Sequence, residues 1–410
     1  MEITGRAKMV KNLVICLDGT GNQIEENISN VLKLYRTLKK TNQSHVREKQ
    51  IVFYDQGVGT LGLTHNWGRF KQKFLNTILG MGFGFGVDRN ILKAYEFLVR
   101  YYQAGDRIYI FGYSRGAHTA RALAGFLYKI GLLRPEQIHL SGSALTAYKH
   151  DEEALATHDG ADDEYEGESE NFRRVAKPLT VSIEFMGLWD TVSSVLVPNP
   201  KKFFIPPLTK EYPPHIHNNP AVKAFRQAAA IDERRRMFPL EPWEDGQLYF
   251  PNKYSKDEPE KQDAQQMWFA GSHGDVGGGY PRKDSGLSQH SLKWMITEAK
   301  IYKLKFISKR MIDYVSGDEA WSSNTKYLYP KAKVDAPIHN SMTFFWRIFE
   351  VFPKLAATRI WPNRKTLLGL YIPCSEPRFI HKDAKIHLSV FERRNRMKNY
   401  DPINLQGHKG

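Results

Sequence analysis

The chain has 410 residues, 41% of them hydrophobic, two cysteines and a formal net charge of +15 at pH 7. This length and composition can fill a large core, in one elaborated domain or in two domains. Two cysteines argue against a disulfide framework, and no apolar run approaches the length of a membrane span.

Strand-like and helix-like segments alternate along most of the chain. The expected strands are Asn12–Leu17, Gln50–Tyr54, Arg107–Phe111, Leu179–Leu188 and Met267–Ala270. The expected helices are Asn30–Lys40, Val87–Tyr102, Ala117–Leu133, Ala221–Ile231 and Ser288–Tyr302. This alternation predicts an α/β fold with a mostly parallel sheet and helices on both faces. We expect an α/β-hydrolase-like catalytic domain over residues 1–300 and a C-terminal, α-rich extension over residues 301–410.

The first expected strand runs into a turn-forming segment, Asp18-Gly19-Thr20-Gly21-Asn22. A loop after an early strand can supply a backbone N–H group to an oxyanion, and we expect Gly19 and Thr20 to do so. An Asx-type turn without a catalytic part is the alternative. An aspartyl-phosphate mechanism is disfavoured, because Cys16 stands where the nucleophilic carboxylate would be needed.

The most informative segment is Gly112-Tyr113-Ser114-Arg115-Gly116, which follows an apolar strand and precedes a helix rich in Ala and Leu. This G-x-S-x-G spacing is typical of the nucleophile elbow of hydrolases, where glycines leave room for a very tight turn. We therefore expect Ser114 to be a nucleophile and the Arg115 N–H group to be an oxyanion donor. A glycine-rich turn with a bystander serine is the alternative.

A nucleophilic serine needs a base and an acid. In α/β hydrolases these follow the serine in the order Asp/Glu, then His, at the ends of later strands. Asp190 ends the apolar run Phe185–Trp189 and is the expected acid. His273 follows the strand that ends at Ala270 and opens a glycine-rich loop, so it is the expected base. His387 is the alternative base.

Three further segments stand out by composition. Residues 151–170 contain ten acidic residues and neither Lys nor Arg, so the rest of the chain carries a net charge of +25. We expect this acidic stretch to form a mobile insertion. Pro198–Pro220 is rich in Pro, Lys and aromatic residues and predicts a rim loop. Met342–Leu355 is aromatic and amphipathic; it packs on the core, caps the active site or lies on a membrane surface.

The basic remainder of the chain suits anionic partners such as phospholipid head groups, and a merely solvated basic surface is the alternative. Zinc-ligand spacings and RNA-binding signatures are absent from the sequence, so we expect no nucleic-acid partner. We also expect no metal and no cofactor. The first apolar run is too short for a signal peptide, which predicts a cytoplasmic protein. Peripheral contact with an anionic membrane and signal-independent secretion stay open.

Seven motifs occur together and in a fixed order: Asp18–Asn22, Gly57–Thr60, Gly82–Gly86, Phe111–Ala117, Gly187–Val192, Ile231–Arg235 and His273–Tyr280. Over about residues 11–300, this set resembles the α/β-hydrolase family of the type VI secretion phospholipase effector catalytic domain. The resemblance implies a hydrolase of phospholipid acyl esters, of phospholipase A type. It also implies that Ser114, Asp190 and His273 form the catalytic set. Effector status does not follow from it.

The sequence therefore predicts a serine hydrolase that cleaves carboxylic esters, above all phospholipid acyl esters, through an acyl-enzyme. Two alternatives stay open. The first is a catalytically silent interaction module built on the same fold. The second is a metal-assisted phosphoester hydrolase that uses Asp18, Asp190, His273 and Asp275.

Overall fold

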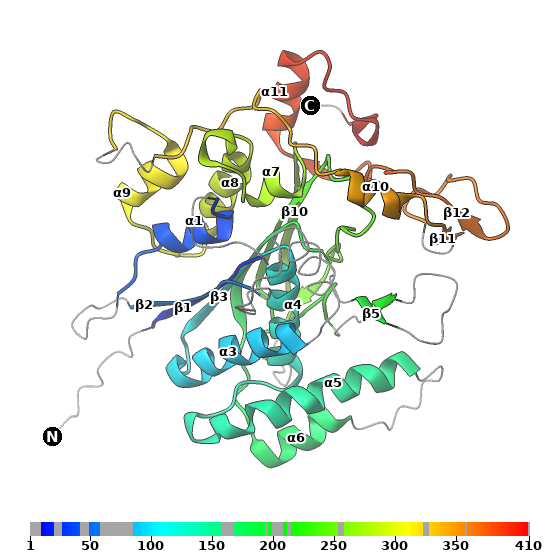
Figure 1. Ribbon diagram of the computed structural model, residues 1–410. Coiled ribbons are helices and arrows are strands. Elements are labelled where there is room, and N and C mark those ends of the chain that lie inside the picture. Colours follow the sequence, from blue (N-terminus) through cyan, green and yellow to red (C-terminus); the bar gives the residue numbers. More distant parts are fainter. Residues whose placement is uncertain are drawn as a thin grey trace, which may run out of the picture.

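A central sheet of seven strands organises the protein. The computed structural model describes residues 10–19, 27–41, 49–57, 85–157, 167–192, 196–198, 208–210, 215–252, 258–322, 328–356 and 359–408. The strand order is β13-β10-β7-β4-β3-β1-β2, and every neighbouring pair is parallel (Figure 1). The strands are β1 (Asn12–Leu17), β2 (Gln50–Asp55), β3 (Arg107–Tyr113), β4 (Ile183–Trp189), β7 (Ala224–Ala230), β10 (Asp263–Phe269) and β13 (Lys385–Ile386). The predicted α/β class with a parallel sheet is confirmed.

Helices cover both faces of this sheet. One face carries α3 (Phe85–Tyr101), α4 (Arg115–Lys129) and α5 (Ser141–Thr157), and the other carries α1 (Asn30–Thr37) and α8 (Ser288–Ile301) (Figure 1). Alternate side chains of β1 enter the two cores, Leu13 and Ile15 on one side and Val14 and Cys16 on the other. A strand buried on both faces is apolar throughout, and this is why the sequence predicted β1 residue for residue.

The remaining elements are short and lie outside the central sheet. The helices are α6 (Glu168–Ala176), α7 (His273–Gly277), α9 (Ser308–Met311), α10 (Phe344–Glu350) and α11 (Leu388–Arg396). The strands are β5 (Leu196–Pro198), β6 (Leu208–Lys210), β8 (Leu248–Tyr249), β9 (Glu260–Lys261), β11 (Lys354–Leu355) and β12 (Leu370–Tyr371). Among the described segments, none is a helix long and apolar enough to cross a bilayer.

The helix predicted over Ala221–Ile231 is wrong, because this segment contains strand β7. Its alanines have a high helix propensity, but the place between β4 and β10 buries every residue of the strand. Small side chains suit a central strand that is covered on both faces. The buried polar Arg226 is satisfied by Asp263 and Glu298, at 2.7 Å each. Tertiary packing has therefore overridden local preference.

The last strand of the sheet comes from the far end of the chain. β13 pairs with β10 in parallel through Lys385 and Ile386, and α11 begins two residues later. The C-terminal extension thus completes an edge of the central sheet. The sequence analysis did not predict this strand, because two residues without an apolar run carry no strand signal.

The acidic stretch is helical at both ends. Asp151 lies in α5, and its carboxylate accepts the Ser169 N–H in the first turn of α6, at 3.2 Å to each oxygen. A carboxylate at this position satisfies a free N–H group and complements the helix dipole, and that is why these residues depart from the expected irregular insertion. Residues 158–166, and most of the predicted rim loop Pro198–Pro220, lie outside the described residues.

The order in which the strands follow one another reverses at β1, which lies inside the sheet between two neighbours. β2 pairs with one side of β1 and β3 with the other. At such a switch point the loops that follow the two strands diverge, and ligands bind in the crevice at the strands' carboxyl ends. Gly19 follows β1 and Ser114 follows β3, so the fold brings these two motifs together.

Candidate active site

Ser114 occupies a strained turn between β3 and α4. Its φ is 56° and its ψ is −121°, a conformation that residues with a side chain rarely adopt. The flanking glycines permit this turn. A Cβ atom on Gly112 would lie 2.6 Å from Ala117 Cα, and one on Gly116 would collide with the carbonyl oxygen of Leu17. The glycine spacing therefore follows from the close packing of this turn against β1.

The N-terminus of α4 is directed at Ser114. The N–H groups of Ala117 and His118 both donate to the Ser114 carbonyl oxygen, at 3.1 and 3.3 Å. Arg115 is the first residue of the helix, at the end where the backbone N–H groups point out of the helix toward the turn. The helix dipole makes this end of α4 favourable for negative charge.

Asp190 and His273 form a buried pair. Each lies just past the end of a strand, and these two strands, β4 and β10, flank β7 in the sheet. Asp190 directly follows β4, and His273 opens α7 after β10. His273 Nδ1 lies 2.6 Å from Asp190 Oδ2, and neither side chain is more than slightly exposed. This contact assigns the Nδ1 proton to the bond with the carboxylate and leaves Nε2 as the basic nitrogen. The structure thus brings together the two residues that the sequence analysis singled out.

Aromatic rings hold the imidazole of His273 in place. The Tyr113 ring stacks on it with 4.8 Å between centroids, and the Phe238 ring meets it edge-on at 5.2 Å. The Tyr113 hydroxyl also donates to the His273 carbonyl oxygen at 3.3 Å. Because Tyr113 precedes Ser114, the serine and the imidazole belong to one cluster. The Ser114 hydroxyl and the His273 ring are not hydrogen-bonded to each other in this structure.

Burial sets the protonation of this histidine. It lowers the pKa of His273 below its ordinary value, even though the hydrogen bond and charge of Asp190 act in the opposite direction. The neutral imidazole is therefore favoured, with its Nε2 lone pair available as a base.

Arg378 is the site residue that the sequence analysis missed. Its guanidinium forms a two-pronged contact with Asp190, with Nη1 2.5 Å from Oδ1 and Nη2 3.0 Å from Oδ2. Both side chains are buried. Burial alone would raise the pKa of Asp190, but the charge of Arg378 and the hydrogen bond from His273 hold it well below its usual range. A single arginine without a surrounding pattern gave no signal in the sequence.

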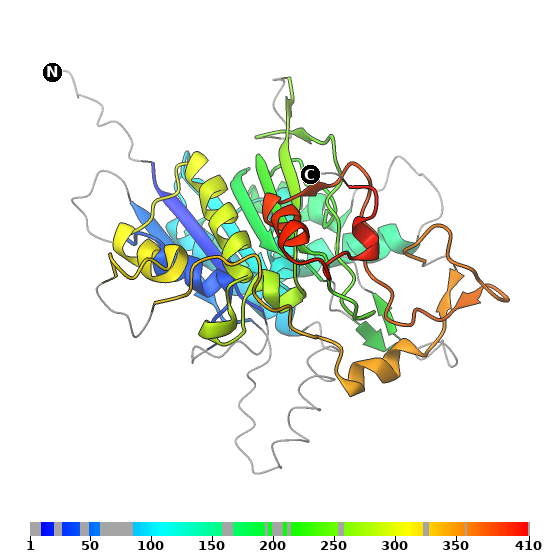
Figure 2. The same cartoon turned by 90° about the horizontal axis from the view of Figure 1, so that it is seen from above.

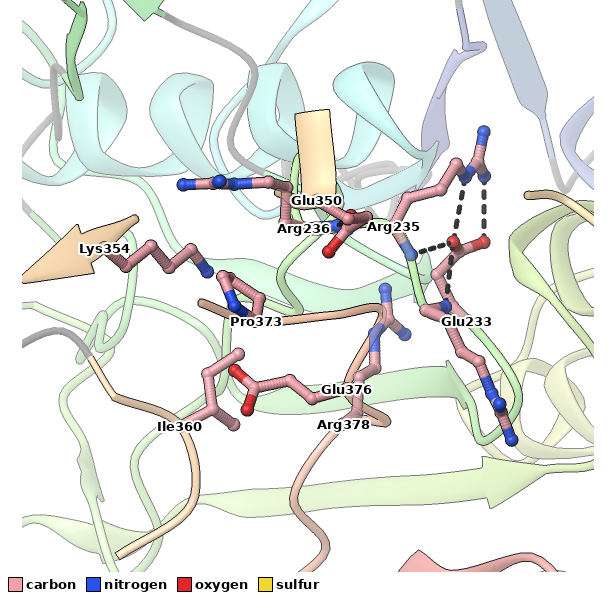
Figure 3. Close-up of a pocket in the computed structure, with 10 residues that line it drawn as sticks. Glu233, Arg235, Arg236, Glu350, Lys354, Ile360, Pro373, Glu376 and Arg378 are labelled. Atoms are coloured by element: carbon pink, nitrogen blue, oxygen red, sulfur yellow. Dashed lines mark hydrogen bonds and ion pairs between the residues drawn. The ribbon is translucent and has the colours of Figure 1, made fainter. Parts of the chain in front are cut away.

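Further contacts fasten the loop that carries His273. The carboxylate of Glu233 accepts the backbone N–H of His273 at 3.1 Å and also pairs with Arg235 at 2.8 Å (Figure 3). Ser341 donates to the same carboxylate at 3.2 Å. Two residues after His273, Asp275 binds the ring and the backbone N–H of His339, at 2.6 and 3.0 Å. Residues beyond 330 thus brace the site from outside the sheet.

The loop after β1 lies against Ser114. The N–H group of Gly19 in this loop already donates a hydrogen bond. A Cβ atom on Gly19 would lie 3.4 Å from Ser114 Cβ. The Gly19 N–H group donates to Asp18 Oδ1 at 2.7 Å, and Asp18 Oδ2 accepts the hydroxyls of Ser29 and Tyr54. Gly19 therefore lies close to Ser114, but its N–H group is already hydrogen-bonded to the Asp18 carboxylate. Thr20, the other predicted donor of this loop, lies outside the described residues.

His387, the alternative base, lies at the N-terminus of α11. Its Nδ1 atom accepts the Ser389 N–H at 3.2 Å, and its ring stacks on Phe269 with 4.6 Å between centroids. Burial, followed by the charge of His290, lowers the pKa of His387 to about 4. The contacts of this ring belong to a helix cap and to packing, and they include neither Ser114 nor Asp190.

The acidic residues of the metal-assisted alternative have separate partners. Asp190 binds His273 and Arg378, and Asp275 binds His339. Asp18 accepts the bonds described above. In the part of the chain that the structure describes, groups of three or more His, Cys, Asp or Glu side chains placed to hold a metal ion are absent.

Comparison with known proteins gives one family and one curated relative. The family model described as "T6SS, Phospholipase effector Tle1-like, catalytic domain", where T6SS is the type VI secretion system, matches residues 11–298. A Saccharomyces cerevisiae protein described as uncharacterized protein YEL023C is 32% identical over 236 residues. The match covers 56% of this chain and 32% of that protein, so the chain spans about a third of the yeast relative.

Two solved structures are also similar. An uncharacterized protein from Pseudomonas aeruginosa shares 18% identity with a TM-score of 0.38, covering 72% of this chain and 46% of the other. The Tle1 effector bound to the VgrG spike from the type 6 secretion system shares 19% identity with a TM-score of 0.33, covering 70% and 56%. The family model spans more than half of the sequence. The chain therefore belongs to the family of T6SS phospholipase effector Tle1-like catalytic domains.

Proposed function

We propose that the protein is a serine hydrolase that cleaves the acyl esters of phospholipids, in the manner of a phospholipase A. The observation that carries this proposal is the strained Ser114 turn at the start of α4, in one cluster with the Asp190–His273 pair. Backbone strain held at a single serine by close packing is typical of a residue presented for reaction. Membership of a phospholipase effector family supports a lipid ester as the substrate.

In this mechanism Ser114 Oγ attacks the acyl carbonyl carbon while His273 Nε2 takes the hydroxyl proton. Asp190 holds the imidazole and stabilises the imidazolium that forms. The tetrahedral intermediate then expels the glycerol oxygen, which receives the proton from His273, and leaves an acyl-serine. Water, deprotonated by His273, attacks this ester and releases the fatty acid. The bond between serine and base often closes only when substrate is bound, which fits the open pair in this structure.

The developing oxyanion needs preorganised N–H donors. The Arg115 N–H group, in the first turn of α4, is the first donor that we propose. The second comes from the loop after β1. Thr20 is favoured over Gly19 for this role, because the Gly19 N–H group is bonded to the Asp18 carboxylate.

Replacement of Ser114 by alanine tests the nucleophile. Ser114→Ala should lower the release of fatty acid from phosphatidylglycerol vesicles by about 10³-fold or more, because the acyl-enzyme cannot form. It should also abolish labelling by a fluorophosphonate probe. Ser308→Ala, at an exposed serine of α9, is the matched control and should keep both signals.

The same assay separates the alternatives. Hydrolysis that survives Ser114→Ala and disappears with a chelator would support a metal-assisted mechanism and overturn the serine mechanism. A wild-type chain that neither hydrolyses lipid nor reacts with the probe would be a silent interaction module.

A further inference from the structure

A protruding arm, of which the structure describes residues 344–356 and 359–372, extends from the body that carries the candidate site. It contains α10 and the hairpin of β11 and β12, in which Lys354 pairs with Tyr371 and Leu355 with Leu370. Figures 1 and 2 show α10 and this hairpin reaching away from the central sheet in both views.

The arm exposes apolar side chains at high density. Of the fifteen large hydrophobic residues that are exposed in the described part of the chain, seven lie on the arm: Phe344, Val351, Phe352, Leu355, Leu367, Leu368 and Ile372. The most exposed are Leu368 at 94%, Phe344 at 82% and Leu367 at 78%. Apolar exposure concentrated on one segment in this way is typical of a binding surface.

Two of these leucines form the tip of the hairpin. Leu367 and Leu370 exchange backbone hydrogen bonds at 2.8 and 2.9 Å, which leaves Leu368 and Gly369 as the turn. Leu368 has a φ of 50°, a left-handed conformation for which glycine or asparagine is the usual residue. A leucine at this position costs conformational energy and buries almost no surface within the described chain, so intramolecular packing does not offset that cost.

The charge of the arm selects the partner. Its exposed basic residues are Arg347, Arg359 and Lys365, whereas Lys354 and Arg364 are half-buried, and Arg364 pairs with Glu376 at 3.8 Å. Its one acidic residue, Glu350, is buried and accepts the N–H groups of Arg236 and Ser375, at 2.7 and 3.1 Å. The exposed surface therefore combines apolar and cationic side chains without an acidic one. Two copies of such a surface would repel each other, whereas an anionic lipid surface matches both its charge and its apolar tip.

We propose that the arm docks on anionic bilayers by inserting Leu367 and Leu368 among the lipids while its exposed basic side chains, Arg347, Arg359 and Lys365, contact the head groups. This inference rests on the proposed function, because it names the surface through which the enzyme reaches its substrate. An anchor made of a few apolar side chains and a basic patch gives reversible binding that weakens as salt is added.

The base of the arm touches the active site. Trp346 of α10 meets the Phe238 ring edge-on, with 5.6 Å between centroids, and Phe238 contacts His273. Figure 3 shows the same junction, where Glu350 and Lys354 of the arm and Pro373 line a small cavity with Arg235 and Arg378. A bilayer held by the arm is thus held beside the catalytic cluster.

Sedimentation with lipid vesicles tests the docking surface. We would use the full chain carrying Ser114→Ala, so that the vesicles stay intact, and mixtures of phosphatidylcholine and phosphatidylglycerol. Adding Leu367→Ser with Leu368→Ser should lower the partition coefficient onto these vesicles by about tenfold or more. Val175→Ser, which changes an exposed valine of α6, is the matched control and should bind like the parent.

Charge reversal gives a second, independent test of the docking surface. Arg359→Glu with Lys365→Glu should remove the preference for phosphatidylglycerol, and added salt should weaken binding of the parent. Unfolding temperatures of all variants should match that of the parent, because these side chains are exposed.

Unchanged binding of both the leucine and the charge variants would overturn the proposal. Light scattering that finds a dimer dissociated by the leucine substitutions would overturn it as well, since the tip would then serve self-association. Failure of the proposed function is a separate result, because it appears as lipid hydrolysis that survives Ser114→Ala.

Discussion

At the scale of single residues, the distinctive feature of the site is that Asp190 is shared. One carboxylate binds the imidazole of His273 and, with both oxygens, the guanidinium of Arg378. Burying an ionised carboxylate with only a neutral partner would cost desolvation free energy. Arg378 supplies a positive charge that offsets this cost. Burial and the charge of Arg235 lower the pKa of His273. The positive charge of Arg378, next to the carboxylate that binds His273, should add to this effect by Coulomb repulsion.

Removing this charge should therefore move the pH profile. The lowered pKa of His273 predicts that kcat/KM is maintained below the ordinary histidine pKa of about 6.5 and falls only at lower pH, where the base becomes protonated. Arg378→Gln should raise the pKa of His273, and the acid limb should shift to higher pH. We also expect kcat to fall by up to about 10²-fold, because the Asp190–His273 geometry loosens.

Two control variants show whether loss of the Arg378 charge causes the shift of the acid limb. Arg378→Lys, which keeps the charge, should restore most of the original acid limb. Arg394→Gln removes a surface arginine that pairs with Asp401 and should behave like the wild type. If Arg378→Gln lowers kcat without moving the acid limb, Arg378 supports the fold alone and the electrostatic role is wrong.

At the scale of elements, the glycines around Ser114 make a prediction about stability. Gly116→Ala should lower the free energy of unfolding by about 1–3 kcal/mol, because the added methyl collides with the Leu17 carbonyl on β1. Gly142→Ala is the matched control. It places the same methyl in an exposed turn of α5 with nothing within 4 Å, and should be neutral or stabilising by about 0.5–1 kcal/mol. Chemical denaturation of both variants measures this difference in the free energy of unfolding. Equal effects of the two substitutions would contradict the prediction.

Elements whose residues alternate between two cores could be predicted from the sequence. β1 and β3 are apolar runs bounded by turn residues, and Asp190 and His273 were found because each stands just past such a strand. β7 could not be predicted in the same way. Its alanines favour a helix in isolation, and only its neighbours β4 and β10 make it a strand.

The contact of Arg378 with Asp190 could not be predicted from the sequence for a related reason. It meets Asp190 across 188 positions of sequence, and one sequence contains no sign of such a pairing. The contacts of Glu233 with His273 and Ser341 are equally non-local. Sequence patterns report periodicity and strand ends, whereas side-chain partners depend on how the strands are ordered in the sheet.

At the scale of the whole molecule, the folded unit that carries the candidate site extends beyond the family match. The matched region ends at residue 298, yet β13, Arg378 and His339 all come from later residues. A small apolar cluster ties the end of the chain to β7 and β10, and its members include Ile231, Trp268, Ile380, Val390 and Leu405. The C-terminal segment is therefore part of the same folded body as the sheet.

A chain that ends at Glu376 should consequently lose both activity and stability. It lacks Arg378, exposes the edge of β10 and loses half of the apolar cluster, so we expect no lipid hydrolysis and a lower unfolding temperature than that of full-length Arg378→Gln. Calorimetry or circular dichroism on heating measures this difference. Equal unfolding temperatures for the two proteins would show that β13 and α11 do not stabilise the sheet.

The order of the residues along the chain also sets the order in which the site is assembled, because Arg378 follows Ser114, Asp190 and His273. A ribosome makes Ser114, Asp190 and His273 long before it makes the arginine that neutralises Asp190 and the strand that closes the edge of β10. The growing chain therefore holds the reactive side chains without their final arrangement. In the proposed mechanism, hydrolysis therefore needs Arg378 and β13 as well as the three earlier residues, so a nascent chain that does not yet contain them should not cleave lipid.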